Sequence, residues 1–283
     1  MALDRIRFFR VGFGVILGLC SFLLFAESSS PDNTSLGYDV SELSKIKTQF
    51  DGYYKDGRIP NYVFGLYSKD KLIYSAANGR TKIDGGEDVD LNTIYWMASM
   101  TKPLVSAAIM KLVEDGDIEL DDELSKFYPE FSEMLVAPAG SYDNTLEDAK
   151  QSITLRHLIS HTSGLTYGTT VTGVGDVAKQ YDEFRMMSCY GPGGKTLQEH
   201  LEVLAQLPLI AHPGEAWNYS VGIDVLGAVI EKVKGKKLDV YLQEEFFEPL
   251  EMNNSGFFIP PEKRNIASRI YTSLDASQIT PER

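Results

Sequence analysis

Pairs of serine and lysine separated by two residues are the first feature that could do chemistry in this 283-residue chain. A lysine amine one helical turn after a serine can take the proton of the serine hydroxyl. Three such pairs occur: Ser44 with Lys47, Ser68 with Lys71, and Ser99 with Lys102. Ser44 lies inside a predicted amphipathic helix and Ser68 in a predicted hairpin turn. Only Ser99 stands where an apolar stretch, residues 94–98, gives way to a helix.

The start of a helix favours acyl transfer at Ser99. The first-turn N–H groups are unpaired and the helix dipole is positive there, so they can stabilise an oxyanion. A plain helix cap is the competing interpretation of Ser99. Lys102 must be neutral to act as a base, so the site is expected to lower its pKa from about 10.4. A second proton carrier is useful, and a tyrosine suits that role.

The sequence gives less support to other catalytic mechanisms. There is no G-x-S-x-G motif, so the sequence does not support the usual α/β-hydrolase triad. His157 and His161 have the spacing of a zinc-binding helix pair, but no glutamate lies between them, which favours structural hydrogen bonding near a turn. The chemistry requires no metal or organic cofactor. A net charge of −13 without a basic stripe argues against nucleic acid as a partner.

The N-terminus has the layout of a secretory signal. Three arginines precede an apolar run over residues 11–25, and Ala26 and a polar stretch follow. We predict a signal peptide over residues 1–26 and a linker over 27–37, hence export to the periplasm or the cell exterior. An uncleaved membrane anchor is the alternative, although the run is shorter than the usual span of about 20 residues. Cleavage would leave Cys189 as the sole cysteine, so no internal disulfide is expected.

Periodicity and turn residues predict an α+β protein. Alternating apolar residues predict a hairpin of strands 62–67 and 72–76, followed by a loop at Gly79, Gly85 and Gly86. Residues 162–194 are expected to form a long loop. Helices are predicted over residues 40–55, 100–115, a short segment after Thr154, a segment after Thr196, 221–234 and 238–247. Their expected caps are Asp39 with Glu42, Thr196 with Glu199, and the terminating glycines Gly116 and Gly235.

Three stretches give the chain a family resemblance. They are residues 97–103 (MASMTKP), 153–165 (ITLRHLISHTSGL) and 213–221 (PGEAWNYSV). Together they resemble the serine β-lactamase-related hydrolases, which include class C β-lactamases, D-alanyl-D-alanine peptidases and similar esterases. The likeness runs from about Ser44 to Arg269.

The resemblance implies both a fold and a set of site residues. The fold is β-lactamase/transpeptidase-like: an antiparallel sheet with flanking helices and a mostly helical subdomain, over residues 38–283. The implied nucleophile is Ser99, with Lys102 as its partner. Tyr219 corresponds to the tyrosine of the family's Tyr-x-Asn motif, where it deprotonates the serine or helps to protonate the leaving group. The substrate is then a small-molecule ester or amide.

Two departures from the family pattern narrow the expected function. Val221 replaces the asparagine of Tyr-x-Asn, which favours a carboxylesterase-like enzyme. No Lys-Thr-Gly or His-x-Gly motif follows Tyr219, so we expect the last strands of the family fold to be missing. A β-lactamase or D-alanyl-D-alanine carboxypeptidase is one alternative. A non-catalytic remnant or binding protein is the other.

Overall fold

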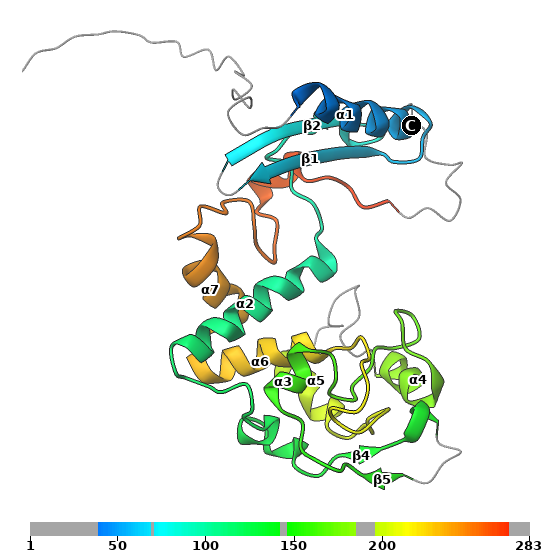
Figure 1. Cartoon of the computed structure of the whole chain (residues 1–283), viewed down its shortest axis with the longest axis vertical. Coiled ribbons are helices and arrows are strands. Elements are labelled where there is room, and N and C mark those ends of the chain that lie inside the picture. Colours follow the sequence, from blue (N-terminus) through cyan, green and yellow to red (C-terminus); the bar gives the residue numbers. More distant parts are fainter. Residues whose placement is uncertain (1–38, 69–70, 142–145, 185–195, 272–283) are drawn as a thin grey trace, which may run out of the picture.

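The computed structural model describes residues 39–68, 71–141, 146–184 and 196–271. The predicted signal peptide, linker and Cys189 lie outside these residues. The helices are α1 (Val40–Lys55), α2 (Thr101–Glu114), α3 (Leu155–Ile159), α4 (Gly175–Glu183), α5 (Leu197–Leu204), α6 (Gly222–Lys234) and α7 (Leu238–Leu242). The strands are β1 (Asn61–Ser68), β2 (Lys71–Lys82), β3 (Gly85–Asp88), β4 (Leu135–Val136) and β5 (Glu147–Asp148). The arrangement is the α+β architecture that the sequence predicts (Figure 1).

The main sheet is an antiparallel meander in the order β1–β2–β3. The predicted hairpin is confirmed, but the predicted glycine loop is wrong. Gly79 lies within β2 and pairs with Asn61, while Gly85 and Gly86 begin β3. Gly79 has a φ of +96°, and a Cβ there would lie 2.8 Å from the Cβ of Asn61. The glycine therefore permits close strand pairing where a turn was expected.

Helix α1 packs on this sheet (Figure 1). Asp39 caps the helix as predicted, because its carboxylate accepts a hydrogen bond from the N–H of Ser41 at 2.9 Å. The predicted capping box is wrong, because the carboxylate of Glu42 instead accepts from the Lys45 ammonium at 2.7 Å. Phe50 of α1 lies against Tyr62 of β1, with ring centroids 5.1 Å apart.

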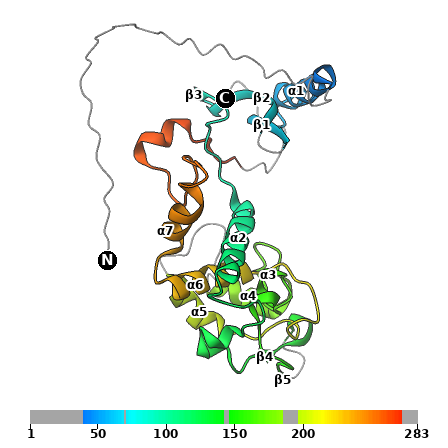
Figure 2. The ribbon, with the colours of Figure 1, turned by 60° about the vertical axis from the view of Figure 1, so that its left-hand side comes forward.

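Helix α2 connects the sheet to the helical part of the molecule, where it packs against α6 and α7 (Figures 1 and 2). Its buried residues are Val105, Ala108, Ile109 and Leu112, the stripe expected for an amphipathic helix. Gly116 follows the helix with a φ of +77°, as a C-terminal glycine should. A large apolar core anchors the helix at its C-terminal end.

The predicted long loop over residues 162–194 is partly wrong, because it contains α4. This helix has only nine residues, and its buried side chains are Val177, Ala178 and Tyr181. So few turns give a weak periodic signal in the sequence. The carboxylate of Asp182 accepts hydrogen bonds from the backbone N–H and the hydroxyl of Thr169, which ties the preceding loop to α4. Residues 185–195 lie outside the described part of the chain.

The remaining helical predictions are confirmed. Thr196 and Glu199 form a capping box at the start of α5, and Gly235 ends α6 with a φ of +64°. Helix α7 continues as a π-helical turn, Gln243–Phe247, within the predicted range 238–247. Among the described residues, the helices are too short or too polar to cross a membrane.

Candidate active site

The structure brings Ser99, Lys102 and Tyr219 together, although Tyr219 is 120 residues from Ser99 in sequence. The phenol of Tyr219 donates a hydrogen bond to the Oγ of Ser99 at 2.7 Å. The ammonium of Lys102 lies 3.4 Å from the same oxygen. Ser99 is exposed, whereas Lys102 and Tyr219 are partly buried. The serine oxygen is thus open to a substrate on one side and faces two proton carriers on the other.

Local backbone geometry presents Ser99 at the start of α2. The serine lies in a 3₁₀ turn, Ala98–Met100, that leads directly into the helix. Ala98 has a φ of 45°, a left-handed conformation that costs energy for a residue with a side chain. The turn is held because α2 is anchored in the core. The serine therefore stands at the N-terminus of α2, where the positive end of the helix dipole suits an oxyanion.

Two packed segments position Tyr219. The backbone N–H of Gly214 donates to the carbonyl of Thr162 at 2.7 Å, and that of Asn218 donates to the carbonyl of His161 at 2.8 Å. The side chain of Asn218 also donates to the carbonyl of Leu165 at 2.8 Å. The stretches 153–165 and 213–221, which carry the family resemblance, therefore form one backbone-bonded unit that holds the tyrosine.

The two histidines with zinc-pair spacing have structural contacts instead. His157 completes a capping box at α3, because its Nδ1 accepts from the N–H of Thr154 at 3.2 Å. The Nδ1 of His161 accepts from the N–H of Ser220 at 3.3 Å, and its ring lies 4.9 Å from that of Tyr219. Within the described residues, no group of three or more His, Cys, Asp or Glu side chains is arranged to hold a metal ion.

Sequence reasoning missed two residues that surround Lys102. The ring of Tyr167 lies 5.5 Å from the ammonium and 5.3 Å from the ring of Tyr219. Asp224 lies in the first turn of α6 and interacts electrostatically with both Lys102 and Tyr167. Asp224 is the single charged residue of the apolar stretch 221–230. A carboxylate isolated in this way is the signal that could have indicated a functional residue.

The electrostatics of the site differ from the expectation for Lys102. Burial lowers the pKa of Lys102, but hydrogen bonds with the hydroxyls of Tyr219 and Tyr167 outweigh it, so the pKa is raised overall. The predicted lowering is therefore absent from this state of the site. Burial raises the pKa of Tyr167 to about 12. Burial and the nearby Lys102 charge lower the pKa of His161, which keeps that imidazole neutral near pH 7.

Asp224 is the carboxyl group most affected by this environment. Burial raises its pKa to about 6 from an ordinary 3.8, although the Lys102 charge opposes the shift. Protonation therefore favours the folded state. The stability associated with the neutral carboxyl is full below pH 4 and is lost as pH rises through about 6. The shift corresponds to at most about 3 kcal/mol.

Asp224→Asn is expected to raise the free energy of unfolding by about 1–3 kcal/mol at pH 8, because the amide avoids the cost of a buried charge. The gain should vanish at pH 3.5, where both side chains are neutral. Urea unfolding at the two pH values measures this. Asp148→Asn, at an exposed position of β5, is the matched control and should change stability little. An equal gain for Asp224→Asn at both pH values would contradict the assignment.

Val221, the departure from Tyr-x-Asn, is fully buried in the apolar core. Its N–H donates to the carbonyl of Thr166 at 3.3 Å, just before α6 begins. The position therefore contributes packing, and its side chain adds no polar group to the region of Lys102.

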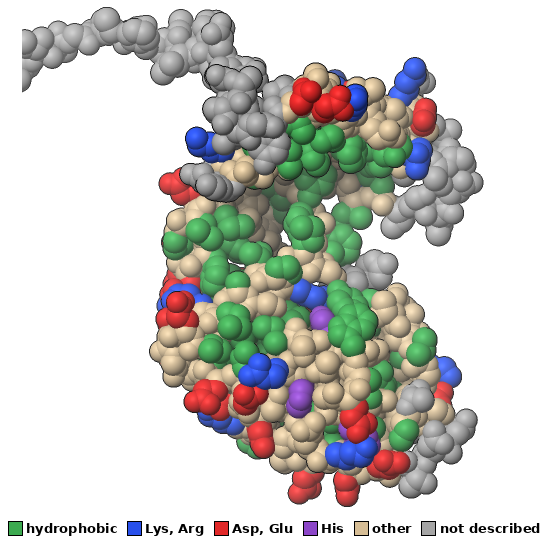
Figure 3. Space-filling model, viewed as in Figure 1, with side chains coloured by type: hydrophobic (Ala, Val, Ile, Leu, Met, Phe, Trp, Pro, Cys, Tyr) green, Lys and Arg blue, Asp and Glu red, His purple; other side chains and the backbone are tan. Residues whose placement is uncertain are grey.

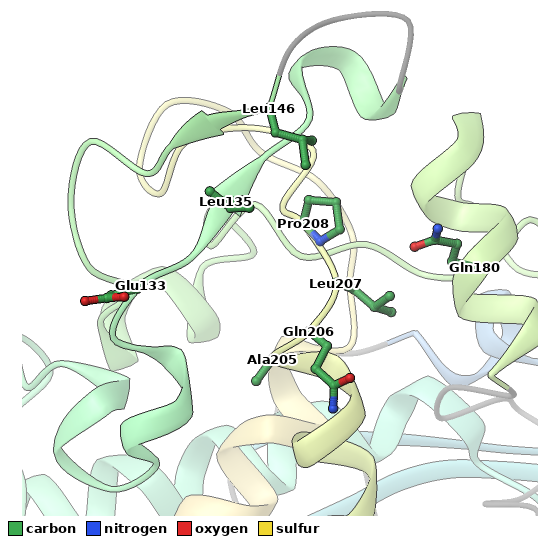
Figure 4. A pocket seen from close by; sticks show the side chains of 8 residues that line it. All are labelled: Glu133, Leu135, Leu146, Gln180, Ala205, Gln206, Leu207 and Pro208. Atoms are coloured by element: carbon green, nitrogen blue, oxygen red, sulfur yellow. The ribbon is translucent and has the colours of Figure 1, made fainter.

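A cavity of about 390 Å³ lies elsewhere in the helical part. Figure 4 shows Pro208 between the side chains of Leu135 and Gln180. The lining residues are Glu133, Leu135, Leu146, Gln180, Ala205, Gln206, Leu207 and Pro208. With one carboxylate and none of the three converging residues, this cavity offers no pair of groups for acid–base catalysis. The candidate site remains at Ser99.

Several known proteins are similar to this chain in sequence, and solved structures are similar to it in fold. Esterase EstB of Burkholderia gladioli is 30% identical over 81% of this chain and 55% of its own length. Lovastatin esterase of Penicillium rubens is 29% identical over 70% of this chain and 48% of its own. The solved structure of EstCE1, a hydrolase with promiscuous acyltransferase activity, superposes with a TM-score of 0.68 at 28% identity, covering 83% of this chain and 56% of that one.

This chain spans about half the length of the curated relatives it matches. The beta-lactamase family matches residues 46–282, which is most of the chain. The antiparallel sheet with flanking helices agrees with that assignment, as does the superposition on EstCE1. This chain therefore belongs to the beta-lactamase family.

Proposed function

We propose that Ser99 is the nucleophile of a serine hydrolase that cleaves carboxylic esters through an acyl-enzyme. The observation that carries the proposal is the 2.7 Å contact between the Tyr219 hydroxyl and the Oγ of Ser99. Because the relatives are about twice as long as the matched region, the activity is proposed for the protein that contains these residues.

Proton transfer in this proposal uses Tyr219 and Lys102 as a pair. In the reactive form the pair has lost one proton, and the Tyr219 oxygen is a phenolate beside the Lys102 ammonium, which lies 4.8 Å from its ring. The phenolate takes the proton of Ser99 while Oγ attacks the ester carbonyl carbon. The carbonyl oxygen becomes an oxyanion near the N-terminus of α2.

The remaining steps return the proton. The tetrahedral intermediate collapses, the bond to the alcohol oxygen breaks, and Tyr219 delivers its proton to that oxygen. Water then attacks the acyl carbon and gives one proton to Tyr219. The bond between that carbon and the Oγ of Ser99 breaks, the carboxylic acid leaves, and Tyr219 returns the proton to Oγ. Since the pKa of Lys102 is raised, the deprotonated pair becomes more populated in alkaline solution. Activity is expected to increase with pH through the alkaline range.

Two observations favour esters over β-lactams. Val221 is a buried apolar residue where the β-lactam-hydrolysing pattern has an amide. Two similar proteins are named as esterases. A β-lactamase or penicillin-binding peptidase is the second candidate, because a penicillin-binding protein homologue from Pyrococcus abyssi superposes with a TM-score of 0.59 at 25% identity, over 82% of this chain and 47% of that one.

The substrate class can be tested by comparing p-nitrophenyl butyrate with a chromogenic cephalosporin, using the same preparation. Ester cleavage is expected to exceed cephalosporin turnover in kcat/KM, and both should be absent in Ser99→Ala. Rapid cephalosporin turnover without ester cleavage would contradict the esterase proposal and favour the second candidate.

A further inference from the structure

Trp217 is a large aromatic residue that remains mostly exposed beside the candidate nucleophile. It is 68% exposed, although tryptophan is usually largely buried. Its ring lies 6.5 Å from that of Tyr219, nearly parallel at 25°, and 6.2 Å from that of His161. Since the hydroxyl of Tyr219 contacts Ser99, the indole lies one ring away from the reacting oxygen.

The position of Trp217 is fixed by its neighbours. The next residue, Asn218, is bonded through its backbone to His161 and through its side chain to Leu165, both at 2.8 Å. The backbone next to the indole is therefore held in place, while the ring itself remains mostly uncovered. Its exposed apolar surface is unfavourable in water, and the free energy is recovered when an apolar group covers it.

The sequence around Ser99 is apolar in the same way. Trp96, Met97 and Met100 are 52%, 50% and 65% exposed. Residues 94–101 and 216–223 contain no charged side chain. Figure 3 shows hydrophobic side chains gathered across the middle of the visible face, around a basic side chain and a histidine. The residues next to Ser99 and Tyr219 in the chain therefore present apolar rather than charged side chains.

We infer that Trp217 is a specificity-determining residue that binds a bulky apolar group attached to the scissile ester. This inference rests on the proposed function, because it assigns the substrate class of the same site. The indole face offers a flat apolar surface for an aromatic ring or a long alkyl chain. Short esters such as acetates with small alcohols cannot cover it and gain little from it.

Kinetics on two ester series test the inference. One series varies the acyl chain from acetate to octanoate with p-nitrophenol constant, and the other varies the alcohol from ethyl to 2-naphthyl with acetate constant. Trp217→Ala is expected to lower kcat/KM by about tenfold or more for the bulkier member of one series, relative to the shorter member. Trp217→Phe should retain most of the preference. The series affected identifies whether the acyl or the alcohol side is bound.

Tyr67→Ala is the matched control, since Tyr67 is an aromatic residue of β1 that is 60% exposed. It should leave both selectivity ratios unchanged. Unchanged ratios in Trp217→Ala, or the same change in Tyr67→Ala, would overturn the inference.

A binding measurement separates this inference from the proposed function. The chain has two tryptophans, so Trp96→Phe leaves Trp217 as the sole indole. In that variant with Ser99→Ala, ethyl octanoate or octyl acetate should shift the fluorescence to shorter wavelength in a saturable way, whereas ethyl acetate should not. If the variant binds the ester saturably but Ser99 of the unmodified protein is never acylated, the proposed function is refuted and the role of Trp217 is not. Ester turnover without any fluorescence response would refute the role of Trp217 alone.

Discussion

Tyr219→Phe is expected to lower kcat for ester hydrolysis by a factor of about 10² to 10⁴, the usual loss when a positioned acid–base group is removed. The substitution deletes only the hydroxyl that contacts Ser99 at 2.7 Å. The aromatic ring, and with it the packing against His161 and Tyr167, is retained. Steady-state kinetics with p-nitrophenyl butyrate measure the effect, and KM should change much less than kcat.

Tyr167→Phe is the control for this prediction. The ring of Tyr167 also lies near Lys102, but no hydrogen bond joins its hydroxyl to Ser99 in the structure. Its loss should therefore reduce kcat less than the loss of the Tyr219 hydroxyl. A fully active Tyr219→Phe, or a larger loss in Tyr167→Phe, would show that the wrong tyrosine has been assigned to proton transfer.

Gly164→Ala is expected to destabilise the fold by about 4 kcal/mol or more, which is exceptional for a single substitution. Gly164 has a φ of +81°, and a Cβ there would lie 2.1 Å from the carbonyl oxygen of Ala211. The carbonyl of Gly164 also accepts a hydrogen bond from the N–H of Ile210 at 2.8 Å. Gly164 therefore cannot move away from Ala211 without breaking the hydrogen bond that joins the two backbone segments. Urea unfolding measures the loss.

Gly116→Ala separates the two causes. Gly116 has a similar φ of +77°, but nothing lies within 4 Å of the position of an added Cβ. Its substitution should cost only the left-handed conformation, about 1–2 kcal/mol. If both alanine variants lower the free energy of unfolding by the same amount, the close approach of the Ala211 carbonyl to Gly164 does not contribute to the loss.

The sequence carried enough information to single out Ser99 as a candidate nucleophile and to predict most helices and strands. Helix position distinguished Ser99 from Ser44, which lies at an exposed position within α1. The capping residues placed the ends of α5 and α6 within a residue or two. Tyr219 required the family resemblance, because its approach to Ser99 depends on backbone bonds between distant segments. The sequence pattern around Tyr219 does not indicate hydrogen bonds to segments that are distant along the chain.

The misses have physical causes of two kinds. The glycines of β2 and β3 favour a loop on turn propensity alone, because that propensity does not reveal close strand pairing, as at Gly79. The environment of Lys102 could not be read from sequence, since Tyr167 and Asp224 come from separate elements and act through burial and charge. A pKa depends on everything packed around a group, whereas sequence motifs specify only its neighbours in the chain.

The most direct test of the account is the site of acylation. The protein would be incubated with a fluorophosphonate or quenched in acid during turnover of p-nitrophenyl butyrate, and its peptides mapped by mass spectrometry. We expect one adduct on Ser99, absent in Ser99→Ala and still formed, more slowly, in Tyr219→Phe. Ester hydrolysis with an adduct on another residue, or with labelling that persists in Ser99→Ala, would contradict it.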